Sequence, residues 1–179
     1  MAKYDQAERF HAGTLTDGWR WFGSHPDTKN GAEGWTFRVW APHAQDVSVV
    51  GDFNNWTNGA HPLTRNGEVW EGFIPGLQEY ASYKYAVKGP DGETRLKTDP
   101  YAFHCETRPA TAGKLYDIAD FKWTDAAFLA KQEKHQAYDS PLNIYEVHLG
   151  SWKKRPNGDF YDYKDMAKEL AAYVKDMGY

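Results

Sequence analysis

Hydrophobic and polar residues alternate with a period of two in several short runs. The runs cover residues 34–40, 46–50, 68–74, 83–88 and 94–98. Proline and glycine turns separate them, and no stretch with helical period lies between them. Short alternating strands without helical crossovers are typical of antiparallel sheets. We therefore predict a mainly β fold, an immunoglobulin-like antiparallel β-sandwich over residues 30–118.

The pattern differs on either side of this region. Residues 1–29 show no sustained periodicity and are interpreted as a lead segment, while residues 119–140 are a connector with a short helix capped by Thr124.

Residues 143–149 predict a strand, and residues 163–177 an amphipathic helix with Asp162 as N-cap and Gly178 after its end. A strand, a loop and a helix form the first part of a βαβ unit. We interpret residues 141–179 as the truncated start of a (β/α)8 barrel.

Composition narrows the function classes. The chain has 21 basic and 25 acidic residues and a net charge of −4, without a basic run that would bind nucleic acid. No apolar stretch approaches the roughly 20 residues that cross a membrane, so we expect a soluble protein. Cys105 is the single cysteine, which favours the cytoplasm. The aromatic content of 16% is unusually high. We expect most of these rings to pack in the core of the sandwich.

Three stretches carry a resemblance to a known family. Residues 50–56, Val-Gly-Asp-Phe-Asn-Asn-Trp, resemble the glycogen-binding modules of branching enzymes, debranching enzymes and the β subunit of the AMP-activated kinase. Residues 143–152, Asn-Ile-Tyr-Glu-Val-His-Leu-Gly-Ser-Trp, resemble the first barrel strand of bacterial glycogen branching enzymes. Residues 10–14 and 22–26 resemble the segment before the module in the same enzymes. The resemblance covers nearly the whole chain.

This resemblance implies an α-glucan substrate such as glycogen, amylose or maltooligosaccharides. The family cuts an α-1,4 chain and rejoins it through an α-1,6 link by retaining double displacement between two carboxylates. Those carboxylates belong to later barrel strands, so we expect the 179-residue chain alone to bind or position glucan without catalysis. Its expected partners are the glucan and its own missing barrel. We expect no cofactor and no metal.

The resemblance also indicates the residues that contact sugar. Trp56 is the expected stacking platform, with packing over a sheet edge as the alternative. Asn55 shapes the loop, and Lys84 either donates to a sugar hydroxyl or is only solvated. The second tryptophan platform of strong glucan binders corresponds to Leu96, which predicts weak binding. Trp70 could replace that platform, although its alternation favours packing in the core or on the sheet.

In the predicted barrel strand, Tyr145 and His148 are expected to line the active site of a full enzyme. The apolar helix face beyond them is expected to fold back on its own strand or on the sandwich, or to self-associate with a second copy through residues 141–179. Two other functions remain open. A stand-alone glycogen-binding scaffold would need no barrel, and a debranching hydrolase would fit Tyr-Glu-Val-His but not Leu-Gly-Ser-Trp.

Overall fold

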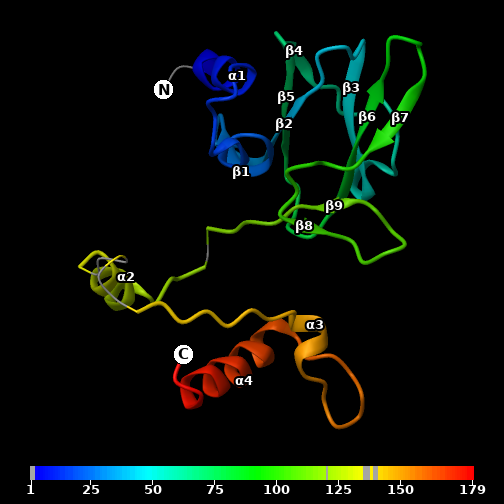
Figure 1. Ribbon diagram of the computed structural model, residues 1–179. Coiled ribbons are helices and arrows are strands. Elements are labelled where there is room, and N and C mark those ends of the chain that lie inside the picture. Colours follow the sequence, from blue (N-terminus) through cyan, green and yellow to red (C-terminus); the bar gives the residue numbers. More distant parts are fainter. Residues whose placement is uncertain (1–2, 120, 135–137, 139–140) are drawn as a thin grey trace. The chain divides into compact units, whose positions relative to one another are not determined.

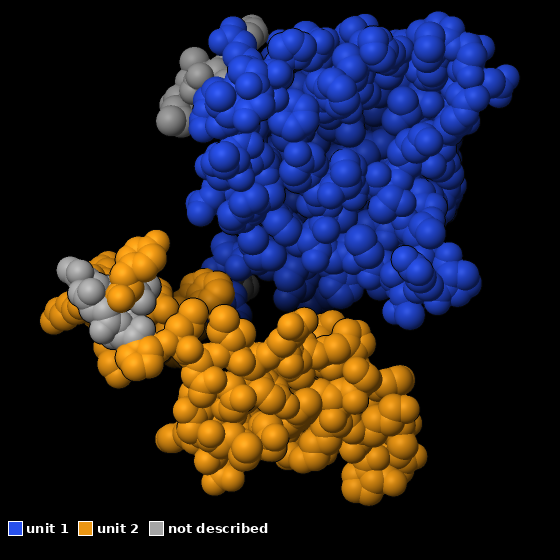
Figure 2. All heavy atoms as spheres, in the orientation of Figure 1, with its two compact units in different colours: residues 1–121 blue, residues 122–179 orange. Residues whose placement is uncertain are grey.

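The computed structural model describes residues 3–119, 121–134, 138 and 141–179 (Figure 1). The chain forms two compact units, Met1–Phe121 and Lys122–Tyr179, each with its own internal packing (Figure 2). Within the described residues, no helix has both the length and the apolar character that a membrane span requires.

The first unit is a sandwich of two antiparallel sheets (Figure 1). The first sheet has the strand order β1-β2-β5-β4, and the second has the order β3-β6-β9-β8, with β7 also paired to β6. The strands of the first sheet are β1 (Gly23–Lys29), β2 (Ala32–Trp40), β4 (Thr64–Asn66) and β5 (Val69–Pro75). The second sheet contains β3 (Asp46–Gly51), β6 (Ser82–Lys88), β7 (Thr94–Lys97), β8 (His104–Cys105) and β9 (Gly113–Lys114). The predicted antiparallel sandwich is confirmed.

The core lies between the two sheets and consists of the inward positions of the alternating runs. Strand β2 contributes Trp35, Phe37 and Val39, and strand β3 contributes Val47 and Val49. The other buried members are Ala44, Leu63, Trp70, Ile74, Tyr83, Tyr85 and Leu115. Because side chains of a strand point alternately to its two faces, the same alternation that predicts the strands also selects these core residues.

A polar cluster inside the core joins the two sheets. The Asp99 carboxylate is 3% exposed, and its Oδ2 accepts hydrogen bonds from the hydroxyls of Tyr83 (2.6 Å) and Tyr85 (3.1 Å) on β6. The Tyr83 hydroxyl also lies 3.0 Å from Ser24 Oγ on β1 of the other sheet. Burial raises the pKa of Asp99 above its ordinary value, although hydrogen bonds from Tyr83, Tyr101 and Tyr85 act in the opposite direction.

The structure corrects the predicted start of the sandwich at residue 30. Residues 23–29 form the edge strand β1, which pairs with β2 along its whole length. Pro26 obscured this strand in the sequence, because proline reads as a turn signal but is tolerated in an edge strand. The predicted lead segment also contains helix α1 (Lys3–His11) and the 3-10 turn η1 (Gly18–Arg20). Phe10 of α1 packs edge-on against Phe22 and Trp40, with ring centroids 4.7 and 5.7 Å apart.

The second unit is helical. Its elements are α2 (Ala126–Gln132), α3 (Leu149–Trp152) and α4 (Tyr163–Asp176). Asp162 caps α4 as predicted, because its carboxylate accepts a hydrogen bond from the Asp165 N–H at 2.9 Å. Thr124 does not cap α2, whose N-cap position is Asp125, and residues 135–137 at its predicted end lie outside the described residues.

Residues 143–149 are not a β-strand, contrary to the prediction. A strand is defined by backbone pairing, and no other described segment pairs with this stretch. The side chains of this stretch nevertheless alternate in exposure. Tyr145, Val147 and Leu149 are half-buried, and the residues between them are exposed. Helix α4 folds back on this stretch, as one of the predicted arrangements requires. Tyr173 of α4 packs against Tyr145, with ring centroids 5.7 Å apart, and both Leu170 and Val174 are half-buried.

Candidate functional site

The loop after β3 contains the motif of residues 50–56, and one asparagine side chain holds it together. Its 3-10 turn η2 (Asp52–Asn54) follows directly on the strand. Asn54 Oδ1 accepts a hydrogen bond from the Gly51 N–H at 2.9 Å, and Asn54 Nδ2 donates to the Val49 carbonyl at 2.9 Å. The same Nδ2 lies 2.9 Å from His61 Nδ1. Three partners for one side chain give this polar loop a defined shape.

Trp56 lies at the end of this loop in an uncommon backbone conformation. Asn55 and Trp56 have φ angles of 50° and 58°, in the left-handed region that non-glycine residues rarely adopt. Strain of this kind persists only where neighbouring bonds enforce it, and it concentrates at functional sites. Here the Trp56 N–H donates to the Gly51 carbonyl at 3.0 Å, and its indole Nε1 donates to Asp52 Oδ1 at 3.1 Å. The indole is thus held by its polar edge and remains 37% exposed.

The Asp52 carboxylate connects this tryptophan to strand β6. While Oδ1 accepts from Trp56, Oδ2 accepts from the backbone N–H of Ser82 at 3.3 Å. Lys84 follows two residues later and points away from the core, because its two neighbours on the strand are core tyrosines. The contacts from Trp56 through Asp52 to Ser82 link this loop to β6, the strand that carries Lys84, although 28 residues separate Trp56 from Lys84 in the sequence.

Further side chains extend the outer face of β6. Lys84 Nζ donates to Thr111 Oγ1 at 2.7 Å, which holds the ammonium group beside a hydroxyl. Leu96 of β7 pairs with Ala86, so it lies on the same face as Lys84, and it is 52% exposed. Thr111 was missed in the sequence, because only the fold brings the connection between β8 and β9 to Lys84.

The structure corrects one predicted sugar contact. Trp70 is 5% exposed and belongs to the core between the sheets. Its indole Nε1 donates to the Ala41 carbonyl at 3.0 Å, and the Arg65 guanidinium lies 5.7 Å from its ring centroid. A ring enclosed in this way offers no face to a glucose residue. The alternative interpretation, that its alternation indicates packing, describes its actual position.

Tyr145 and His148, the predicted contacts within a full enzyme, lie in the second unit. The Tyr145 hydroxyl accepts a hydrogen bond from Trp152 Nε1 at 2.9 Å, and its ring packs against Tyr173 and Tyr179. The proximity of Tyr145 raises the pKa of the Tyr173 phenol. His148 is exposed, and its Nδ1 lies 2.8 Å from Ser151 Oγ. Their role in lining an active site stays a prediction.

The exposed indole of Trp56 and the hydrogen-bonded pair of Lys84 and Thr111 are chemical groups that can contact a sugar. A fixed indole offers an apolar face on which the C–H face of a glucose ring can stack. The ammonium of Lys84 and the hydroxyl of Thr111 can exchange hydrogen bonds with sugar hydroxyls. These two kinds of group together are typical of sites for neutral, polyhydroxylated ligands.

Comparison with known proteins agrees with this chemistry. Residues 21–102 match the family described as carbohydrate-binding module 48 (isoamylase N-terminal domain). The 1,4-alpha-glucan branching enzyme of Halothermothrix orenii is 44% identical over 172 residues, which are 95% of this chain and 27% of that enzyme. The enzymes of the same name from Bacillus subtilis and Bacillus caldolyticus are 45% and 46% identical, again over 95% of this chain. The chain thus spans about a quarter of the length of these curated relatives.

Solved structures that match part of this chain include two pullulanases. That of Bacillus acidopullulyticus is 27% identical, with a TM-score of 0.43, over 54% of this chain and 12% of the pullulanase. That of Klebsiella pneumoniae is 31% identical, with a TM-score of 0.45, over 55% of this chain and 11% of the pullulanase.

Proposed function

Since this chain belongs to the family of 1,4-alpha-glucan branching enzymes and corresponds to their N-terminal region, we propose that its first unit binds α-glucan chains on the outer face of the second sheet. Trp56 is the stacking platform in this proposal, and Lys84 and Thr111 are the adjacent polar contacts. Asn55 shapes the backbone that presents the indole. Glycogen, amylose and maltooligosaccharides all contain the α-1,4-linked glucose that this surface would recognise.

For the whole protein, we propose the activity that the relatives' name describes, the formation of α-1,6 branches in α-1,4-glucans. The module would hold the polymer close to the catalytic part and raise its local concentration there. The debranching alternative has less support, since the relatives that match 95% of this chain are branching enzymes. The free and exposed Cys105 fits a reducing compartment, so the proposal includes a cytoplasmic location.

One observation carries the binding proposal, the conformation of Trp56. The left-handed backbone of Trp56 costs conformational energy, and the indole is partly exposed and held at its nitrogen by Asp52. A side chain that only filled a gap would not need this strain. The same geometry is advantageous for a ligand platform, because a ring that is already fixed loses little entropy when sugar binds.

Replacing Trp56 with alanine is expected to weaken binding of maltoheptaose at least about tenfold, the effect of losing a stacking anchor. The dissociation constant can be measured by affinity electrophoresis or calorimetry. Trp19→Ala is the matched control, because Trp19 is similarly exposed at 40% but packs against Phe103 elsewhere on the unit. Equal affinities for the wild type and Trp56→Ala would contradict the proposed site.

A further inference from the structure

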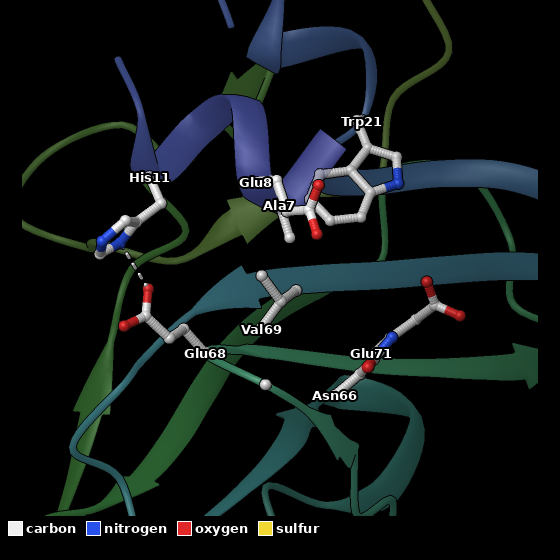
Figure 3. Close-up of a pocket in the computed structure, with 9 residues that line it drawn as sticks. Ala7, Glu8, His11, Trp21, Asn66, Glu68, Val69 and Glu71 are labelled. Carbon is white, nitrogen blue, oxygen red and sulfur yellow. Dashed lines mark hydrogen bonds and ion pairs between the residues drawn. The ribbon is translucent and has the colours of Figure 1, made fainter. Parts of the chain in front are cut away.

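A pocket of about 510 Å³ lies between helix α1 and the outer face of the first sheet (Figure 3). Helix α1 contributes Glu8 and His11, and Trp21 follows the turn η1. Strand β5 and the turn before it contribute Glu68, Val69 and Glu71. The volume falls within the range of roughly 300–1,000 Å³ that is usual for small-molecule sites. Helix α1 and the first sheet line this pocket, whereas Lys84 lies on β6 of the second sheet and Trp56 in the loop after β3.

Glu68 is fixed at one end of the pocket. Its Oε2 accepts a hydrogen bond from Trp40 Nε1 at 3.2 Å and lies 3.1 Å from His11 Nδ1 (Figure 3). The bond from Trp40 is the main cause of a lowered pKa, and the contact with His11 adds to it. Glu68 is therefore an ionised carboxylate with a defined position and strong acceptor oxygens.

Trp21 and Glu71 lie at the other end (Figure 3), and Arg38 contacts both of them. Arg38 Nε donates to Glu71 Oε2 at 2.5 Å, and both side chains are largely buried. The Arg38 guanidinium lies 5.6 Å from the centroid of the Trp21 ring, and its Nη1 donates to the Trp21 carbonyl. Val69 lies between the two ends, with only 3% of its surface exposed.

We infer that this pocket is a second α-glucan-binding site, which takes one or two glucosyl units of the same polymer. The ionised carboxylate of Glu68 accepts hydrogen bonds from neighbouring sugar hydroxyls, while Trp21 contacts the apolar face of the ring. Arg38 balances the charge of Glu71, whereas Glu8 and Glu68 leave the lining acidic. Among the described residues, no group of three or more acidic, histidine or cysteine side chains could hold a metal ion, so the lining suits a neutral polyol better than a metal cation. The choice of glucan as ligand rests on the proposed function.

The indole N–H signals of the tryptophans provide a separate probe for each site. In a proton–nitrogen correlation spectrum, Trp40 reports on the pocket through its bond to Glu68, and Trp56 reports on the loop site. Titration of the whole chain with maltoheptaose is expected to shift both signals, with separate affinities. The buried Trp70 indole is the internal control and should not shift.

Two variants separate the sites. In Trp56→Ala, the Trp40 signal should still shift with an unchanged dissociation constant. In Glu68→Gln, that dissociation constant should rise at least about fivefold, because a neutral amide replaces a charged acceptor. The Trp56 titration should stay the same, and unchanged Trp56 and Trp70 indole signals verify folding.

Each outcome decides between the two proposals. A Trp56 shift without any Trp40 shift would overturn the second site and leave the first intact. A Trp40 response that disappears in Trp56→Ala would also overturn the second site, because the response would then spread from the loop. A Trp40 response alone would support the pocket and contradict the Trp56 platform. No response of either signal would overturn both.

Discussion

Replacement of Asp99 by alanine is expected to lower the free energy of unfolding of the first unit by about 3 kcal/mol. The substitution leaves the buried hydroxyls of Tyr83 and Tyr85 without their carboxylate acceptor and opens a gap between the sheets. Chemical denaturation followed by tryptophan fluorescence measures the change as a lower midpoint with an unchanged m-value. Asp46→Ala, at the exposed start of β3, is the control and should change stability by less than about 0.5 kcal/mol.

The same carboxyl group predicts a pH dependence with a definite sign. Burial raises the pKa of Asp99, so the folded state retains the proton at pH values where the unfolded state releases it. Stability therefore falls as the pH rises from the ordinary value of 3.8 towards the raised pKa, and then levels off. Asp99→Asn should remove this part of the slope. A wild-type slope identical to that of Asp99→Asn would contradict the assignment.

The sandwich could be predicted from the sequence because its core is built from alternating side chains. Trp35, Phe37 and Val39 are inward on β2, and their spacing is visible without any structure. Strand β1 was missed because it is recognised only by its pairing with β2. Pro26 pairs with Trp35, and no pattern within residues 23–29 predicts that pairing. The assignment of this edge strand therefore depends on its pairing partner.

The candidate site was only partly predictable. The motif of residues 50–56 indicated Trp56, but the strained backbone and the bond to Asp52 depend on the folded loop. Trp70 was wrongly included as a substitute platform, although its alternation already favoured packing, and the structure buries it in the core. The contact between Lys84 and Thr111 depends on how β6, β8 and β9 pair, and 27 residues separate the two.

Gly51→Ala is expected to lower the free energy of unfolding by about 2–3 kcal/mol and to weaken maltoheptaose binding at the same time. Its φ angle of −179° is extended backbone that any residue adopts, so the demand for glycine is one of space. A Cβ at this position would lie 2.2 Å from the Ser82 carbonyl oxygen and 2.6 Å from the Phe53 ring. Because the obstacle includes backbone, β3 and β6 would have to separate where they pair.

Binding should weaken in Gly51→Ala because the Gly51 carbonyl accepts the hydrogen bond from the Trp56 N–H, which helps to hold the strained platform in place. Gly59→Ala is the matched control, since Gly59 has a φ of +78° but open space around its Cβ position. It should cost only the backbone strain of about 1 kcal/mol and leave the platform in place. Denaturation midpoints and calorimetric titrations of both variants test the argument. If Gly51→Ala retained wild-type stability and affinity, the close approach of β3 to β6 would not be what positions Trp56.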